Sequence, residues 1–171
     1  MSNSSKVVVG LSGGVDSSVA AALLLKQGYK VIGVMLRLWS EPGEEGSNRC
    51  CTPDSMAMAR RVASQLGIPF YVLDAKEVFR QTVVETFISG YTSGKTPNPC
   101  LVCNRNIRWG FLMNYAAALN VEFIATGHYA QLVRTSSGSV ELRKGIDSNK
   151  DQSYVLSVLT QAQLAHTLLP L

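Results

Sequence analysis

The sequence predicts an α/β protein with an open parallel sheet, helices on both faces of that sheet, and a small β-hairpin beside it. Three observations favour this fold class. Short apolar, β-branched runs alternate with helical patterns, a glycine-rich turn follows the first run, and two strand-like runs flank a Ser/Gly turn at residues 136–139. Strands that alternate with helices form right-handed βαβ units, which place parallel strands between helical layers.

Four buried strands are expected in the main sheet because each run is short, apolar and bounded by turn residues. The expected strands are residues 6–11, 30–36, 69–74 and 123–127, and the hairpin strands are residues 131–135 and 140–143. No apolar run reaches the roughly 18 residues that a membrane-spanning helix needs, so no membrane contact is expected.

Helices are expected between these strands wherever apolar residues repeat at helical spacing. The first starts near Ser17 and carries Val19, and the second is capped by Asp54 and ends at Gly67. Further helices are expected at residues 78–88, 107–119 and 152–159, and polar loops at 40–53 and 90–104. In the last helix, Tyr154 is expected to face the core.

The composition is that of an ordinary globular domain, with 171 residues, 46% hydrophobic content and a net charge of +4. A mildly basic charge permits a polyanionic partner without requiring one. The N-terminus lacks the apolar stretch of a secretory signal, so a cytoplasmic location is expected. In a reducing cytosol, close cysteine pairs favour thiol chemistry or a metal over a disulfide; the pair Cys50-Cys51 is expected to be incidental.

The turn after the first strand has the composition of an anion-binding loop. It contains three glycines and three serines between residues 10 and 18, at the carboxyl end of a strand, where open parallel sheets bind ligands. Glycines let backbone N–H groups approach an anion, and a helix start adds partial positive charge. A carboxylate would repel a phosphate, so Asp16 is expected to hold Mg²⁺ or to take a proton. The alternative, a tight turn with serine caps, needs only one glycine.

This loop, Ser-Gly-Gly-Val-Asp-Ser-Ser at residues 12–18, resembles the pyrophosphatase loop of the adenine nucleotide alpha hydrolase-like enzymes, which split ATP into AMP and pyrophosphate. Three further segments are similar to the tRNA 2-thiouridylases within that group. They are Thr-Pro-Asn-Pro-Cys-Leu-Val-Cys-Asn at 96–104, Ala-Thr-Gly-His-Tyr-Ala at 125–130, and Asp-Ser-Asn-Lys-Asp-Gln-Ser-Tyr at 147–154. Together the four segments span nearly the whole chain in the family's order.

The resemblance implies ATP-dependent 2-thiolation of the wobble uridine of tRNA, with ATP and Mg²⁺ as cofactors. The residues that would bind ATP are Gly10, Leu11, Ser12, Gly13, Gly14, Val15, Asp16, Ser17, Leu36 and Gly127. Those that would contact tRNA or its flipped target base are Asn98, Pro99, Cys100, His128, Lys150, Asp151 and Gln152. Cys103 and Asp16 would be catalytic. The implied partners are the anticodon arm of tRNA and a persulfide sulfur donor protein.

The implied mechanism activates a poor electrophile. Adenylation turns the uridine carbonyl oxygen into a leaving group, and an enzyme-bound sulfur then attacks the carbon. A thiolate is needed at Cys103, and Arg105 and Arg108 are expected to favour it. Taken singly, His128 would be a hydrogen-bonded histidine at a strand end and Lys150 a solvated surface lysine.

Two departures from the family pattern bear on the sulfur step. Cys100 stands where many members carry aspartate, and the family's second cysteine, which lies further downstream, is not in this chain. We therefore expect the chain to bind ATP without completing thiolation, and to be cut from a longer polypeptide. Cys100 and Cys103 could, with a third cysteine, ligate a 4Fe–4S cluster; the alternative is a cluster-free persulfide and disulfide route.

The resemblance also divides the chain into an ATP-pyrophosphatase domain at residues 1–129 and a hairpin and helix at 130–171 that lead into a tRNA-binding region. Two other classes remain open from the residues. One is an ATP-pyrophosphatase ligase that acts on a small molecule, and the other is a non-catalytic cysteine-cluster module that binds RNA. ATP turnover with and without tRNA discriminates among the three.

Overall fold

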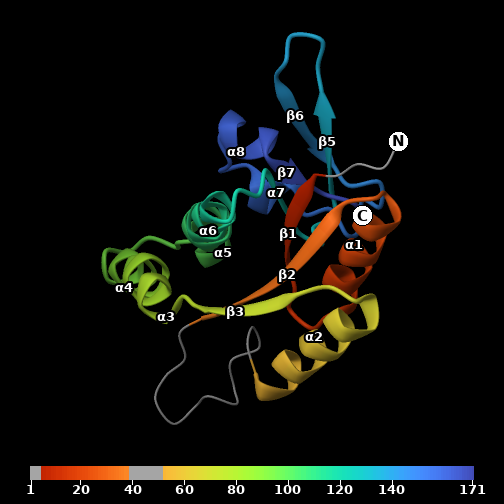
Figure 1. The fold of residues 1–171 in the computed structure, drawn as a ribbon. Helices are drawn as coiled ribbons and strands as arrows, with labels where there is room; N and C mark the ends of the chain where they lie inside the picture. The colour runs from red at the N-terminus through yellow and green to blue at the C-terminus, as the bar shows by residue number, and fades with distance from the viewer. Residues whose placement is uncertain (1–4, 39–51) are drawn as a thin grey trace.

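Figure 1 shows a computed structural model, which describes residues 5–38 and 52–171. The pair Cys50-Cys51 and the part of the expected polar loop up to residue 51 lie outside the described residues. Among the described residues, no helix is long and apolar enough to cross a membrane.

The main sheet contains five parallel strands in the order β3-β2-β1-β4-β7. They are β1 (Lys6–Gly10), β2 (Lys30–Arg37), β3 (Phe70–Asp74), β4 (Phe123–Ala125) and β7 (Thr167–Leu168). A separate antiparallel pair, β5 (Ala130–Arg134) and β6 (Val140–Lys144), projects away from the main sheet in Figure 1. The predicted parallel sheet with a small hairpin is confirmed.

The helices connect the strands. On one side of the sheet lie α1 (Val15–Lys26) and α2 (Pro53–Leu66). One helical run comprises α3 (Lys76–Phe79), the π-helical η1 (Arg80–Val84) and α4 (Glu85–Thr92). A second comprises α5 (Pro99–Cys103), the π-helical η2 (Asn104–Phe111) and α6 (Leu112–Ala118). Two short helices, α7 (Ser153–Leu156) and α8 (Gln161–Ala165), precede β7.

Side chains of the central strand β1 divide the core into two layers. Val7 and Val9 pack with Leu24 and the α2 alanines on one face, whereas Val8 packs with Trp109 on the other face. All three valines are fully buried. Since successive side chains of a strand point to opposite faces, burial of every one of them requires helices on both faces. The predicted two-sided helical cover is confirmed.

The loop predicted for residues 90–104 is wrong in its second half, where α5 begins at Pro99. The Asn98 side chain caps this helix by accepting a hydrogen bond from the Cys100 backbone N–H at 3.0 Å, and proline suits the first helical position. The helix expected to start at residue 107 therefore starts eight residues earlier. The helix expected at 78–88 extends in both directions, from Lys76 to Thr92.

Two smaller predictions were also wrong. Thr52, rather than Asp54, caps α2, because its hydroxyl accepts from the Ser55 backbone N–H at 3.1 Å. The helix expected near Ser17 is present as α1, which starts at Val15; smaller alanines form its buried face, and Val19 is 42% exposed. Tyr154 is 63% exposed, because α7 is only four residues long and buries the next two side chains instead.

The fifth strand, β7, was not predicted, and a polar network anchors it to the helical layer. Trp109 Nε1 donates to Thr167 Oγ1 at 2.6 Å, and that hydroxyl donates to the Gln163 carbonyl at 2.6 Å. Gln163 Nε2 in turn donates to the Trp109 carbonyl at 3.1 Å. The sequence feature that could have indicated this segment is the Thr160–Gln163 capping box, which marks the start of α8 just before β7.

Replacing Thr167 with valine tests this anchor. The Thr167→Val substitution keeps the shape of the side chain but leaves the buried Trp109 N–H without its acceptor. We expect the free energy of unfolding to fall by about 1–3 kcal/mol, measured by urea denaturation. Thr86→Val is the matched control, because the Thr86 hydroxyl is exposed and bonds only to its own helix. Equal losses in the two variants would contradict the anchoring role.

Candidate functional site

The loop between β1 and α1 is held in shape by its own serines. The Ser17 hydroxyl donates to the Gly14 carbonyl at 3.1 Å and accepts from the Ser12 backbone N–H at 3.2 Å. The Ser18 hydroxyl also donates to Gly14, at 2.8 Å. Gly14 is the N-cap of α1 and has no side chain to cap it, so among the described residues no N-cap side chain satisfies the first amides of α1. Such a helix start attracts anions.

Two close backbone approaches require glycine around this loop. Gly13 has a φ of +83°, and a Cβ there would lie 2.3 Å from the Ser55 carbonyl oxygen at the start of α2. Gly127, just after β4, would place a Cβ 2.7 Å from the carbonyl carbon of Asp16. The second approach fixes the end of β4 against the first turn of α1.

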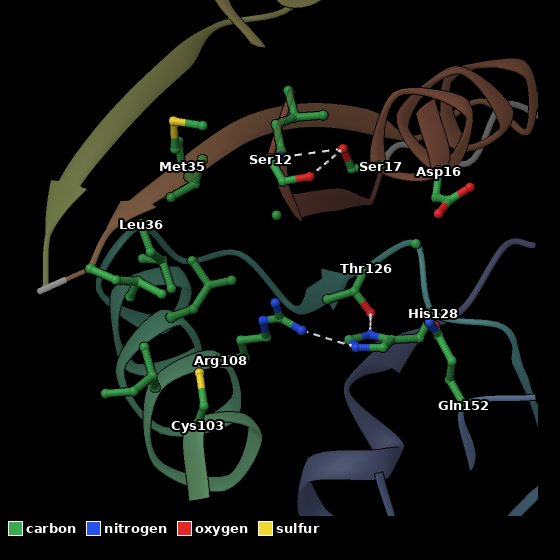
Figure 2. A pocket seen from close by; sticks show the side chains of 17 residues that line it. Ser12, Asp16, Ser17, Met35, Leu36, Cys103, Arg108, Thr126, His128 and Gln152 are labelled. Atoms are coloured by element: carbon green, nitrogen blue, oxygen red, sulfur yellow. Dashed lines mark hydrogen bonds between the residues drawn. The ribbon is translucent and has the colours of Figure 1, made fainter. Parts of the chain in front are cut away.

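A pocket of about 250 Å³ opens at this edge, where the chain order of the strands reverses between β1 and β4. In open parallel sheets, ligands bind at this switch point. Figure 2 shows Ser12, Ser17 and Asp16 on one side of the pocket and Cys103 on the other. The lining residues are Gly10, Leu11, Ser12, Asp16, Ser17, Val34, Met35, Leu36, Leu38, Cys103, Ile107, Arg108, Leu112, Thr126, Gly127, His128 and Gln152.

A second pocket, of about 330 Å³, adjoins the first and has a more apolar lining. Its lining residues are Leu38, Phe79, Val83, Pro99, Cys100, Cys103, Asn104, Arg108, His128, Gln152, Tyr154 and Val155. Five residues line both pockets: Leu38, Cys103, Arg108, His128 and Gln152. We call these five residues the shared wall. A reaction that joins a ligand of one pocket to a ligand of the other would take place beside it.

A chain of buried and partly buried hydrogen bonds fixes the shared wall. Arg108 Nη1 lies 3.0 Å from His128 Nε2 and donates to Asn104 Oδ1 at 3.2 Å (Figure 2 shows the first contact). Because a guanidinium can only donate, His128 Nε2 must accept, and the ring proton resides on Nδ1. His128 Nδ1 then donates to Thr126 Oγ1 at 2.8 Å. Asn104 is itself anchored, since its Nδ2 donates to the Val155 carbonyl at 2.8 Å.

His128 is held in its neutral form by this environment. Burial, and next the neighbouring Arg108 guanidinium, lower the pKa of His128 to about 3. Both effects disfavour the protonated ring, since one removes water and the other adds a like charge. The side chain is therefore a fixed acceptor rather than an acid or base near neutral pH.

The π-helical η2 places Cys103 and Arg108 at the same wall. In an α-helix, residues five apart point about 140° away from each other. A π-helical turn is wider, with hydrogen bonds from i+5 to i, and brings such residues back toward a common side. Cys103 immediately precedes η2 and Arg108 lies within it, and both line both pockets.

Asp16 connects the glycine loop to the segment at residues 145–152. Tyr129 Oη donates to Asp16 Oδ1 at 2.8 Å, and this bond is the main cause of the raised pKa of Tyr129. Tyr129 and Gln152 exchange two hydrogen bonds, from Tyr129 N to Gln152 Oε1 at 3.1 Å and from Gln152 N to Tyr129 O at 2.9 Å. The Lys150 ammonium lies 5.4 Å from the centre of the Tyr129 ring.

Several expected site residues lie beside the two pockets rather than in their linings. Gly13, Gly14 and Val15 form the turn and the first residue of α1, and Asn98 caps α5. The Asp151 carboxylate accepts from the Gly145 N–H at 2.8 Å and from Ser153, and the bond from Gly145 is the main cause of its lowered pKa. Lys150 and Asp151 thus belong to the neighbouring loop, and their RNA contacts stay predictions.

The structure adds lining residues that the motifs did not identify. Arg108 was expected only as a helper of the Cys103 thiolate, yet it lines both pockets. Thr126 and Asn104 lie within the motif segments 125–130 and 96–104, but no role was expected of either residue. Phe79 and Val83 come from the helical run after β3, where the sequence offered nothing beyond apolar periodicity.

The described residues offer few metal ligands. No group of three or more His, Cys, Asp or Glu side chains able to hold a metal ion occurs within residues 5–38 and 52–171. Cys100 and Cys103 alone line the second pocket as potential thiolate ligands. A 4Fe–4S cluster takes three or four cysteines, so these two do not constitute a site by themselves. Asp16, exposed beside the loop, suits a hard cation that also binds phosphate oxygens and water.

The fold and the pocket define an α/β protein of the open parallel class, with a ligand site at the strand-order switch point. More particularly, the chain belongs to the family described as tRNA methyl transferase HUP domain, whose model matches residues 5–171.

Curated relatives share this region at about 50% identity. They include proteins named tRNA-specific 2-thiouridylase MnmA from Moorella thermoacetica (52% over 167 residues, 96% of this chain and 47% of the relative) and Desulfitobacterium hafniense strain Y51 (50% over 167 residues, 97% and 45%). A third, from Clostridioides difficile strain 630, is 49% identical over 168 residues, 97% of this chain and 46% of the relative. The chain thus spans about half the length of these relatives.

Solved structures are more distant. A predicted subunit of tRNA methyltransferase from Methanocaldococcus jannaschii aligns with a TM-score of 0.48 and 20% identity over 72% of this chain and 52% of that chain. An NH3-dependent NAD synthetase from Campylobacter jejuni aligns with a TM-score of 0.47 and 20% identity over 72% and 47%.

The buried neutral His128 makes stability depend on pH. Between pH 3 and 6.5 the unfolded chain carries a proton on His128 that the folded chain does not, so stability rises with pH in this range and is level above it. From pH 6.5 down to 5, we expect the loss of stability due to His128 to steepen toward about 1.4 kcal/mol per pH unit. Chemical denaturation at several pH values measures it.

His128→Gln should remove this slope, and the same substitution at the exposed His166 is the matched control. A His128→Gln variant with the slope of the parent would contradict the neutral, buried state.

Proposed function

We propose that this chain is the ATP-binding part of a tRNA 2-thiouridylase that adenylates O2 of the wobble uridine and exchanges that oxygen for sulfur. The observation that carries the proposal is the pair of adjoining pockets with a shared wall that contains Cys103 and Arg108. The relatives named MnmA support the same assignment by sequence.

The first pocket suits ATP. The uncapped start of α1 and the serines of the loop offer donors to the β- and γ-phosphates. Leu36, at the other end of the pocket, offers an apolar surface to adenine. Asp16 Oδ1 already accepts from Tyr129, so its second oxygen is the better placed ligand for a Mg²⁺ ion that neutralises the leaving pyrophosphate.

The second pocket suits a flat, uncharged ring. Its wall combines the aromatic side chains of Phe79 and Tyr154 with the edge of α5, where Pro99 and Cys100 lie. A base that leaves the anticodon stack costs roughly a few kcal/mol, and stacking against such side chains offsets that cost. Tyr154 is 63% exposed in this structure, which is unusual for a large aromatic side chain. A base bound in the second pocket would cover this ring.

The reaction proceeds between the two pockets. A lone pair of uridine O2 forms a bond to the α-phosphorus, the bond from that phosphorus to the bridging oxygen breaks, and pyrophosphate leaves with the electron pair while N3 releases its proton. A persulfide sulfur on Cys103 then attacks C2, and AMP leaves with the former O2. A second thiolate cleaves the sulfur–sulfur bond, and N3 of the 2-thiouridine regains a proton.

RNA contacts are proposed on the side of the hairpin. Lys150, Asp151 and Gln152 would meet the tRNA anticodon arm, with His128 held at the boundary to the base pocket. Residues 1–129 would form the ATP-pyrophosphatase domain, and residues 130–171 would lead into a tRNA-binding region, although β7 from that segment also completes the main sheet. The proposed location is the cytoplasm, where a persulfide sulfur donor protein would load Cys103.

ATP–pyrophosphate exchange in the full-length natural polypeptide tests the function. We expect exchange to require Mg²⁺ and tRNA. Asp16→Asn should lower the exchange rate by on the order of 100-fold, because the Mg²⁺ ion that would neutralise the leaving pyrophosphate in the transition state loses a carboxylate ligand. Cys103→Ser should retain exchange and form no 2-thiouridine. Asp54→Asn, an exposed carboxylate in the first turn of α2, is the control. Exchange supported by a small acceptor without tRNA, or no nucleotide uptake at all, would refute the proposal.

Iron binding tests the sulfur route. With a cluster, anaerobic reconstitution of the full-length polypeptide should give visible absorption that is lost in both Cys100→Ser and Cys103→Ser variants. With a cluster-free persulfide route, only Cys103→Ser should abolish thiolation, and no cysteine-dependent iron binding should occur. Cys100 and Cys103 in the second pocket are compatible with both routes, and this pair of results decides between them.

A further inference from the structure

Arg108 occupies the boundary between the two pockets and lines both of them. In Figure 2 its guanidinium lies between Cys103 and His128, on the opposite side of the pocket from Ser12 and Ser17. A residue at this boundary is adjacent to any bond that forms between a ligand of the first pocket and a ligand of the second.

The guanidinium is fixed through only one of its three nitrogens. Nη1 carries two protons and uses both, on Asn104 Oδ1 and on His128 Nε2. Nε and Nη2 keep three more N–H groups, and within the described chain none of these has a hydrogen-bond partner. Nη1 therefore has no N–H group left to donate, whereas Nε and Nη2 can still donate to a ligand.

The charge of Arg108 has no protein counter-ion in residues 5–38 and 52–171, where every salt bridge involves other residues. A guanidinium stays protonated at all physiological pH values, and a partly buried one without an anion is costly. His128 does not offset that charge, since burial and Arg108 itself hold it neutral. This arrangement favours an anionic ligand at the boundary of the pockets.

Of the ATP atoms, the α-phosphoryl group is the one that must lie at this boundary. The glycine loop and Asp16 lie across the first pocket from Arg108 (Figure 2), where the β- and γ-phosphates would bind under the proposed function. The uridine O2 would approach from the second pocket. The charge that changes during adenylation is thus carried by the α-phosphoryl oxygens, and planar N–H donors bind such oxygens well.

We propose that Arg108 is a catalytic residue of the adenylation step, which binds an α-phosphoryl oxygen through Nε and Nη2, with His128, Asn104 and Thr126 as its positioning residues. The assignment rests on the proposed function. Arg108 forms and breaks no covalent bond and keeps its protons throughout; it stabilises the negative charge of the phosphoryl group while pyrophosphate departs.

The test is tRNA-dependent ATP–pyrophosphate exchange in the full-length natural polypeptide, with kcat and the KM for ATP measured separately. Arg108→Gln should lower kcat by on the order of 100- to 1000-fold with little change in KM, because the interaction strengthens in the transition state. Arg108→Lys keeps the charge without the fork and should recover a large part of the rate. Arg61→Gln removes the same charge from an exposed side chain of α2 and should leave kcat unchanged.

Histidine NMR adds a readout that does not depend on turnover. In the parent, the His128 proton should be found on Nδ1, and Arg108→Gln should raise the His128 pKa, because a neighbouring cation is lost. Thr126→Val removes the acceptor of the Nδ1 proton; it should let the tautomer shift and should lower kcat less than Arg108→Gln does.

Each outcome is decisive. A folded Arg108→Gln protein with the kcat of the parent, a change confined to KM, or an equal loss in Arg61→Gln would overturn the role of Arg108 and leave the proposed function standing. A parent protein without exchange would refute the proposed function and the role of Arg108 with it. Should Arg108→Gln fail to fold, the Arg108→Lys and Thr126→Val variants carry the same comparison.

Discussion

The rest of the site depends on one steric constraint, the approach of Gly127 to the first turn of α1. A Cβ at position 127 would lie within 3 Å of three backbone atoms of Asp16 and Ser17. Because only a glycine fits, the end of β4 can lie against the glycine loop, and Thr126 and His128 reach the pocket from there. His128 then fixes Arg108, so the position of a guanidinium in η2 is set by a contact between β4 and α1.

The two walls of the pocket are built on different physical principles. On the loop side, partial charges of backbone amides act together with one exposed carboxylate, a combination suited to phosphates that bring their own cation. On the η2 side, a full positive charge is held by neutral partners, Asn104 and His128, in a half-buried setting. Neutral partners orient Arg108 without cancelling its charge, whereas a carboxylate in the same place would have satisfied it and left nothing for a ligand.

Much of the fold could be predicted from local pattern, and the failures share a cause. Strands β1 to β4 and the hairpin are marked by apolar runs and turn residues within each segment. The two-residue β7 is too short to show the alternation of apolar and polar residues that marks a strand. Its position depends on the hydrogen bond from Trp109 to Thr167, two residues that lie 58 positions apart in the sequence. The Asn98 cap is a local sequence signal for a helix that starts at Pro99. The proline and glycine residues nearby nevertheless led to the prediction of a loop.

The site could be predicted only as far as its motifs extend. The fold brings residues from different motif segments, such as Ser17, Gly127 and Cys103, to one pocket, and their roles stay predictions. The register that places Arg108 beside Cys103 arises from a π-helical stretch, and no simple residue pattern signals one. The contact of Tyr129 with Asp16 spans 113 residues and joins the loop to the segment that carries Lys150. If Mg²⁺ binds Asp16 through its second oxygen, it shares that carboxylate with Tyr129, so the cation and, through Tyr129, the 145–152 segment act on the same side chain.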